Sequence, residues 1–234
     1  MPSNEAALKY LNQNKLLYLD MLEILRRGSG ELLYAGEDGV LLYDRWGKEH
    51  LMSARDRAAL DKILEYLPAC EVVVGHELWY KEELAKRFGL RQEQICRQAA
   101  WLHAELPTVP AFDGQLRLLT QEWAPYVEAH YSHSFGGVAY IEGAIRRGML
   151  GAFVGDTLAG FAGFHVEGAM GMLEVLPQYR RHGLGQALLL GTVRLALERG
   201  EYAFGQVFID KEPSLALQRR AGMAVSEEIL YWLF

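Results

Sequence analysis

Residues 173–189 read Leu-Glu-Val-Leu-Pro-Gln-Tyr-Arg-Arg-His-Gly-Leu-Gly-Gln-Ala-Leu-Leu, and this stretch decides how the chain is interpreted. An apolar strand stops at Pro177, a basic turn follows, and Gly183 and Gly185 stand where an apolar helix begins. The first turn of a helix presents amide hydrogens without intrahelical partners, and the helix dipole adds partial positive charge there. Glycines let a ligand approach the backbone closely. The stretch therefore predicts a binding site for a phosphate or pyrophosphate group.

Three basic residues, Arg180, Arg181 and His182, precede this helix. The alternative interpretation is a plain strand-to-helix turn with a glycine-rich cap. Cations before a helix start oppose the dipole unless an anion lies between, and no acidic capping residue is present to serve as that anion. The charges therefore favour a bound anion.

The segment resembles the pyrophosphate-binding motif of the GNAT superfamily of N-acetyltransferases, Arg/Gln-x-x-Gly-x-Gly/Ala after a strand that ends in Val-x-Pro. Arg180 to Gly185 fill the motif here, after Val175-Leu176-Pro177. The paired strands expected over residues 152–164 look like the second and third strands of the family. The resemblance covers about residues 115–234 and implies acetyl-CoA as the co-substrate.

The fold class that follows is α+β (α/β by some schemes). It is a GNAT-type mixed, mostly antiparallel sheet flanked by helices, preceded by a smaller α+β N-terminal domain comparable to a degenerate GNAT-like half. Two prolines and a glycine without periodicity predict a linker at residues 107–114, between an N-terminal domain (1–106) and the GNAT domain (115–234). In the GNAT domain the patterns predict strands and helices in the order β-α-α-β-β-β-α-β-α-β.

Patterns in the N-terminal half predict a helix over residues 5–27, a hairpin about the turn at residues 36–39, and a helix opened by Ser53. A strand at residues 70–75, a helix at 79–88 and a strand around Ile95 follow. No cofactor motif is found there.

The resemblance implies a set of CoA-binding residues. The backbone of Val175 and Leu176 is expected to pair with the pantetheine arm, and the amides from Arg181 to Gln186 to hold the pyrophosphate. The set comprises Val175, Leu176, Arg180, Arg181, His182, Gly183, Leu184, Gly185 and Gln186. A strand amide would polarise the thioester carbonyl, and the amine would attack directly.

Proton transfer needs a base and allows an acid. Glu174, on the strand beside the thioester, is the preferred base; the alternative is a half-buried carboxylate paired with a neighbouring strand. His165 and Glu167 are weaker candidates. Gln218 occupies the position at which the family often has an acidic tyrosine, so either another tyrosine such as Tyr231 serves or the thiolate leaves unassisted.

The stretch Tyr131-Ser-His-Ser-Phe-Gly-Gly lies between two expected helices. In the family this region often lines the acceptor pocket, so Tyr131, His133, Ser134 and also Glu167 are expected to bind substrate. The alternative for the stretch is a flexible capping loop.

Composition limits the partners. The net charge of −6 argues against nucleic acid and is compatible with a cationic substrate. No apolar run spans a membrane, no signal peptide is recognised, and no Cys/His cluster has metal-ligand spacing. Two distant cysteines, Cys70 and Cys96, favour reduced thiols in a cytoplasmic protein, and a homodimer is possible.

The preferred function is transfer of an acetyl group from acetyl-CoA to a primary amine of a small molecule. Two alternatives stay open: a CoA-binding sensor or pseudoenzyme, suggested by Gln218, and a peptide or protein N-acetyltransferase.

Overall fold

A computed structural model describes residues 2–132 and 136–234. Contacts divide the chain into two compact units. The first comprises Met1–Ala99, Gln206–Glu212 and Val225–Phe234, and the second comprises Ala100–Gly205 and Pro213–Ala224. None of the helices in the described residues has the length and apolar character needed to cross a membrane.

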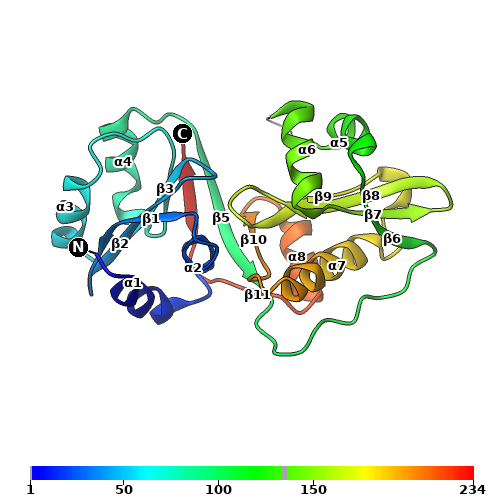
Figure 1. Ribbon diagram of the computed structural model, residues 1–234, viewed down its shortest axis with the longest axis horizontal. Helices are drawn as coiled ribbons and strands as arrows, with labels where there is room; N and C mark the ends of the chain where they lie inside the picture. The colour runs from blue at the N-terminus through cyan, green and yellow to red at the C-terminus, as the bar shows by residue number, and fades with distance from the viewer. Residues whose placement is uncertain (1, 133–135) are drawn as a thin grey trace. The chain divides into compact units, whose positions relative to one another are not determined.

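The N-terminal part of the chain alternates helices and short strands (Figure 1). Its elements are α1 (Asn4–Leu11), η1 (Asn12–Asn14), α2 (Leu19–Arg26), β1 (Gly30–Ala35), β2 (Gly39–Asp44), β3 (Glu49–Ala54), α3 (Arg57–Glu65), β4 (Val73–Gly75), η2 (Leu78–Tyr80), α4 (Lys81–Phe88) and β5 (Glu93–Ala100).

The C-terminal part contains the predicted strand-turn-helix segment. Its elements are β6 (Gln115–Leu118), η3 (Gln121–Trp123), α5 (Ala124–His130), α6 (Gly137–Gly148), β7 (Leu150–Val154), β8 (Thr157–Phe164), β9 (Met170–Val175), η4 (Pro177–Tyr179), α7 (Leu184–Glu198), β10 (Phe204–Phe208), α8 (Glu212–Arg220), β11 (Ala224–Val225) and β12 (Leu230–Leu233).

The two parts repeat one order of elements. Two helices, three strands, a helix, a strand, a helix and a strand run from α1 to β5, and the same order runs from α5 to β11. Within each set of three strands, neighbours pair antiparallel. The mixed α+β fold is therefore as predicted, and in this order of elements α3 corresponds to α7 and β3 to β9.

The strands form two sheets. One has the order β6-β7-β8-β9; the other has the order β1-β2-β3-β4-β12-β5-β10, with β11 paired to β5. In the larger sheet β3 and β4 are parallel, whereas β12 pairs antiparallel with both β4 and β5. Residues 115–234 thus supply strands to both sheets. In the larger sheet, β12 satisfies backbone hydrogen-bonding groups of two N-terminal strands at once.

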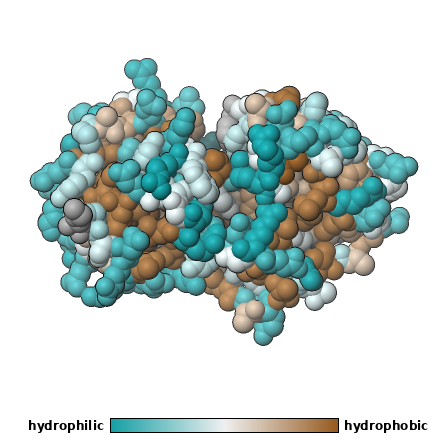
Figure 2. Space-filling model, viewed as in Figure 1, coloured by the Kyte–Doolittle hydropathy of each residue, from teal (hydrophilic) through white to brown (hydrophobic). Residues whose placement is uncertain are grey.

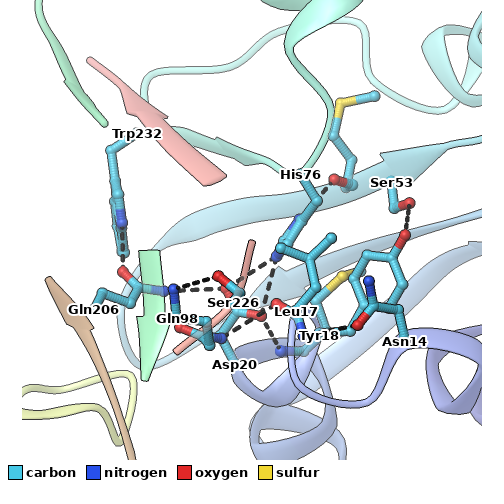
Figure 3. A network of polar contacts seen from close by, with 12 residues as sticks. Asn14, Leu17, Tyr18, Asp20, Ser53, His76, Gln98, Gln206, Ser226 and Trp232 are labelled. Atoms are coloured by element: carbon cyan, nitrogen blue, oxygen red, sulfur yellow. Dashed lines mark hydrogen bonds and ion pairs between the residues drawn. The ribbon is translucent and has the colours of Figure 1, made fainter. Parts of the chain in front are cut away.

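A buried polar network helps to bind these C-terminal segments to the first unit (Figure 3). Trp232 donates its indole N–H to Gln206 Oε1 at 2.6 Å, and Gln206 Nε2 donates to Asp20 Oδ2 at 3.1 Å. The backbone amide of Gln98 donates to Ser226 Oγ at 3.0 Å. Residues 206–212 and 225–234 are expected from the sequence to belong to the GNAT domain, whereas their contacts place them in the first unit. The domain boundaries themselves stay a prediction.

The predicted single helix over residues 5–27 is wrong. The structure divides it into α1, η1 and α2. The side chain of Asn12 donates to the carbonyl of Leu8, and Asn14 Oδ1 accepts from the amide of Leu17. Such short polar side chains compete with the helical ladder for backbone groups, and this competition interrupts the helix.

The predicted helix start at Ser53 is also wrong. Residues 49–54 form β3, and α3 begins after Asp56, whose carboxylate accepts from the amide of Ala59 at 3.0 Å. Ser53 is instead buried, and its hydroxyl bonds to Glu77 at 2.5 Å and to Tyr10 at 2.7 Å. Because the buried hydroxyl already bonds to these side chains, it is not available to cap a helix.

Helices cover both faces of the four-stranded sheet. Leu184 and Leu188 of α7 pack with Ala152 and Ala159. Residues of α5 and α6 pack on the other face, in a cluster that also contains Phe153, Phe161 and Met172. The central strand β8 is buried along almost its whole length. This packing fixes the position of β9 and of the start of α7.

Candidate active site

β9 is one of the two edge strands of the four-stranded sheet. Its register with β8 is irregular, since Gly171 pairs with Gly163 and Glu174 pairs with Phe161. β9 therefore has one more residue than β8 between these two pairs. Met172, inside this bulge, has a φ of 53°. A bulge bends the strand and re-aims its side chains. The edge strand is therefore bent directly beside Glu174, the predicted base.

Glu174 points to the face of the sheet opposite α7. Leu173 and Val175 pack with the α7 cluster, whereas Glu174 accepts a hydrogen bond at 2.8 Å from the hydroxyl of Ser132, which follows α5. This confirms the predicted alternation. The other carboxylate oxygen lies 3.4 Å from the guanidinium of Arg180, and the Glu174 side chain is 18% exposed. The alternative, a carboxylate paired with a neighbouring strand, is not what the contacts show, because both partners, Ser132 and Arg180, lie outside the strands.

The turn between β9 and α7 has an unusual backbone. Leu176 donates its amide to the carbonyl of Ala159, and Pro177 begins the short helix η4. Arg181 and Gly183 then adopt left-handed conformations, with φ values of 69° and 82°. For the arginine this conformation is strained, and such strain often lies at functional sites.

Five consecutive backbone amides stand in this turn and at the start of α7. Those of Arg181, His182, Gly183, Leu184 and Gly185 have no hydrogen-bond partner among the described residues. The amide of Gln186, which was also predicted to bind phosphate, donates instead to the carbonyl of Gly183 at 3.1 Å. A run of amides with left-handed residues between them forms a concave anion-binding surface.

The side chains around these amides match an anion. Arg180, Arg181, His182 and Gly183 are exposed, Leu184 and Leu176 are buried beneath them, and Val175, Gly185 and Gln186 are half-buried. The first turn of α7 contains no acidic residue. At the corresponding start of α3, Asp56 caps the helix with its own carboxylate. Of these two helix starts, that of α7 therefore remains available to an external anion.

Gly185 gives a further indication. A Cβ atom at this position would lie 3.6 Å from Leu217 and 3.8 Å from Val175, which is ordinary van der Waals contact. Packing within the protein therefore does not require glycine here. A ligand that approaches the backbone closely would explain why glycine stands at this position.

A second group of side chains lies on the Glu174 face. Tyr131 packs edge-on against Phe161, and burial, followed by the charges of Glu174 and Glu167, raises its pKa to about 12. Glu167, in the turn between β8 and β9, is only 8% exposed. The structure thus brings together Glu174, Glu167 and Tyr131, three of the predicted site residues.

His165 and Tyr140 complete this group. His165 Nδ1 lies 2.7 Å from the hydroxyl of Tyr140, which extends from α6. Burial lowers the pKa of His165, against the opposing effect of Glu167, so the imidazole is neutral at neutral pH. Tyr140 was missed by the sequence analysis because a tyrosine inside an amphipathic helix carries no local signal of a site.

Two predicted residues, His133 and Ser134, lie outside the described residues. Tyr231 lies in the hydrophobic core of the first unit, where it is fully buried and packs against Tyr80. Burial raises its pKa well above the ordinary value. Tyr231 belongs to the first unit and Glu174 to the second, and the predicted role of this tyrosine as the acid gains no support. Gln218, on α8, has a buried Oε1 without a hydrogen-bond partner in the described part of the chain.

Known proteins share this fold. Residues 113–223 match the acetyltransferase (GNAT) family. No curated protein matches the chain. The fold is similar to the X-ray structure of a Drosophila protein, with 18% identity, a TM-score of 0.66, and 100% of this chain and 97% of that chain covered.

Two GCN5-related N-acetyltransferases share the fold as well. That of Kribbella flavida has 14% identity and a TM-score of 0.58, with 94% of this chain and 93% of that chain covered. That of Sphaerobacter thermophilus has 18% identity and a TM-score of 0.53, with 98% and 90% covered. With its strand, turn and helix in place and its sequence matching the family, the C-terminal part of the chain, residues 113–223, is a GNAT-family acetyltransferase domain.

Proposed function

We propose that the chain transfers an acetyl group from acetyl-CoA to a primary amine of a small molecule. One observation carries the proposal: five consecutive amides without partners among the described residues stand at the start of α7, directly after the edge strand that carries Glu174. An anion-binding surface next to a bent edge strand with a carboxylate suits an acyl donor that has a pyrophosphate at one end and a thioester at the other.

The residues present fit such a donor. The amides from Arg181 to Gly185 would hold the pyrophosphate, with Arg180, Arg181 and His182 adding positive charge. The edge of β9 at Val175 would pair with the pantetheine arm, whereas the amide of Leu176 is already bonded to the carbonyl of Ala159. Acetyl-CoA supplies the activated acetyl group, and the protein supplies its orientation.

The base in this proposal is Glu174. Its carboxylate would accept a proton from the attacking amine, directly or through one water molecule. The hydroxyl of Ser132 bonds to one carboxylate oxygen and fixes its orientation. We propose no protein acid for the leaving thiolate. The amide of Gln218 cannot give up a proton as a tyrosine hydroxyl can, and Tyr231 is buried in the first unit.

Glu167 supports a cationic acceptor. The residue is only 8% exposed, and its negative charge acts on both Tyr131 and His165. A cation close to a carboxylate that is so little exposed is favourable. An ammonium group brought close to Tyr131 and Glu167 would supply the cation and place the amine near Glu174.

Calorimetric titration with acetyl-CoA tests the proposal, with CoA and ATP as comparison ligands. Micromolar binding of acetyl-CoA and CoA, with much weaker binding of ATP, is expected; amines can then be screened by thiol release. A folded sample that binds neither acetyl-CoA nor CoA would contradict the proposal.

The second candidate is a CoA-binding sensor, which Gln218 in the tyrosine position favours. A sensor would bind acetyl-CoA with the same affinity but release no thiol with any amine. Single-turnover assays with a panel of monoamines, diamines and a peptide amine separate the two functions, and also test the peptide acceptor.

We also propose that the protein is cytoplasmic. Both cysteines are free, and burial raises the pKa of Cys70 to about 11 and that of Cys96 to about 12, as expected for unreactive reduced thiols in the cytoplasm. Apolar residues are visible among hydrophilic ones on the face drawn in Figure 2. A homodimer is proposed from sequence alone, and size-exclusion chromatography with light scattering would test it.

A further inference from the structure

Gln218 of α8 has a polar atom that the protein buries without satisfying. The residue as a whole is half-buried, but its side-chain Oε1 is buried and has no hydrogen-bond partner among the residues that the structure describes. An amide oxygen that leaves water without gaining a hydrogen bond destabilises the folded chain. A donor that comes from outside the protein would remove this cost.

The backbone of Gln218 is held firmly. Its carbonyl accepts hydrogen bonds from the amides of Ala221 and Met223, both at 3.1 Å, and these bonds close the C-terminal end of α8. Leu215, on the preceding turn of the helix, is only 3% exposed. The side chain of Gln218 therefore extends from an anchored helix, and its unpaired oxygen does not result from a loose segment of chain.

α8 lies beside the start of α7. A Cβ atom at Gly185 would lie 3.6 Å from Leu217 of α8 and 3.8 Å from Val175 of β9. Leu217 and Leu173 of β9 also pack against the same buried cluster. The start of α7, the end of β9 and α8 thus meet around Gly185, which is the last of the five amides, and Gln218 directly follows Leu217 in this helix.

The chemistry of CoA narrows the choice of donor. Its ionised pyrophosphate has only hydrogen-bond acceptors, so it cannot satisfy a carbonyl oxygen. Its pantetheine arm contains secondary amides, and each of them has an N–H that donates as a backbone amide does. In the proposed function this arm leads from the amides of α7 to the edge of β9 at Val175, so it passes the place where α8 meets both elements.

We propose that Gln218 binds the acyl donor, and that its Oε1 accepts a hydrogen bond from an amide N–H of the pantetheine arm. The inference rests on the proposed function and adds a residue that holds the arm between the pyrophosphate and the thioester. The pyrophosphate and the arm are then recognised by different elements, the start of α7 and α8.

Gln218→Met tests this contact, because methionine is similar in size and has no amide oxygen. Calorimetric titrations compare CoA with its nucleotide part, which keeps the pyrophosphate and lacks the pantetheine arm. The affinity of the variant for CoA should fall by about tenfold, since a donor of the arm loses its acceptor. The affinity for the nucleotide part should stay unchanged.

Acetyl-CoA identifies the donating group. Acetylation removes the thiol hydrogen of CoA and leaves the amides of the arm intact. Gln218→Met should therefore lose the same factor of affinity for acetyl-CoA as for CoA. A loss confined to CoA would assign the donor to the thiol and would overturn the inference.

Thermal unfolding gives a readout that does not depend on turnover. Without ligand, Gln218→Met should unfold at a higher temperature than the wild type, because the unsatisfied oxygen has been replaced by an apolar group. Saturating CoA should raise the unfolding temperature of the wild type more than that of the variant. A side chain that only packs would show no change in ligand affinity.

Gln98→Met is the matched control. Gln98 also has a buried Oε1 without a partner in the part of the chain that the structure describes, but it belongs to the first unit, where its Nε2 donates to the carbonyl of Leu17 at 3.3 Å. Its replacement should leave CoA affinity unchanged. An equal loss of affinity in the two variants would overturn the specific contact.

The outcomes separate the inference from the proposed function. Retained CoA affinity in Gln218→Met, or an equal loss for CoA and for its nucleotide part, would overturn the contact and leave the function standing. Absence of CoA binding by the folded wild type would overturn both. Circular dichroism checks the folding of each variant, and Gln218→Leu repeats the test with a shorter side chain.

Discussion

At the scale of single residues, the role of Glu174 is set by its neighbours. Strand alternation directs its side chain away from α7, and the bulge at Met172 bends the strand beside it. Ser132 and Arg180 then approach from two loops and hold one carboxylate oxygen each. Three separate segments of chain thus converge on one carboxylate, as expected for a group whose position matters to a reaction.

Replacement of this carboxylate tests its role. Glu174→Gln keeps the shape of the side chain but removes the proton acceptor, so kcat should fall by roughly 10² to 10⁴, while acetyl-CoA affinity stays within about twofold because the amides of α7 are untouched. Steady-state kinetics and calorimetry measure the two quantities. Glu198→Gln, on the exposed side of α7, is the control; unchanged turnover of Glu174→Gln across pH would exclude Glu174 from the mechanism.

At the scale of elements, two helices at corresponding positions begin in different ways. α3 starts with Asp56, whose carboxylate satisfies the amide of Ala59. α7 starts with Gly183 in a left-handed conformation, without a side-chain cap and without an acidic residue in its first turn. One helix start is therefore satisfied from within the chain, and the other is available to an external anion.

Substitutions at the two ends of α7 test this distinction. Gly183 and Gly200 flank the helix, have φ values of 82° and 71°, and have nothing within 4 Å of an added Cβ. Gly183→Glu and Gly200→Glu should therefore each lose about 1 kcal/mol of unfolding free energy from backbone strain. Only Gly183→Glu should weaken CoA binding, by about tenfold or more, because it places bulk and negative charge among the amides.

Urea denaturation and calorimetry of both variants give the two quantities. Equal loss of CoA affinity in both variants would attribute the effect to strain in the helix. Retained affinity in a folded Gly183→Glu protein would contradict the assignment of the binding site.

At the scale of the whole molecule, each compact unit combines distant segments of the chain. The first unit takes in residues 206–212 and 225–234, and the buried network around Asp20 and His76 joins α2, β3 and β10 (Figure 3). His76 Nδ1 lies 2.9 Å from the carbonyl of Met52, and its Nε2 lies 3.0 Å from Asp20. Both partners accept hydrogen bonds, so only the protonated imidazolium satisfies both at once.

This network makes the stability of the protein depend on pH. Burial is the largest single influence and opposes the charged imidazolium, but the charge and hydrogen bond of Asp20, together with Glu77 and the carbonyl of Met52, outweigh it and raise the pKa of His76 in the folded chain. A raised folded pKa gives stability that is fully present below about pH 6.5, the unfolded value, and that is lost as pH rises through the folded pKa. Urea denaturation of wild type and His76→Gln over pH should therefore show a stability difference that shrinks with rising pH.

The comparison with His76→Gln removes the effects of other groups. His50 and His165 have pKa values lowered by burial, so they destabilise the folded chain in acid, but they do so equally in both proteins. A stability difference that stays constant with pH would mean that His76 has the same pKa in the folded and unfolded chain, and one that grows with rising pH would mean that His76 is neutral in the folded protein.

The sequence alone determined the segment that carries the chemistry. Proline ends β9, glycines permit the left-handed turn, and an apolar helix follows; each of these signals acts over a few residues, so it can be read locally. The partners of these residues could not be read in this way. Nothing near Glu174 in the sequence indicates Ser132, and nothing near His165 indicates Tyr140.

Only the tertiary structure decided which strands share a sheet. β12 lies between β4 and β5, more than 130 residues away from either, and this pairing places Tyr231 in the core of the first unit. A distant partner also decides the role of Ser53. Its hydroxyl bonds to Glu77, and the residue lies in β3 and does not cap a helix as expected. Hydrogen-bonding edges and buried surfaces are satisfied by whichever segment reaches them, and a local sequence pattern contains no information about a partner so distant in the chain.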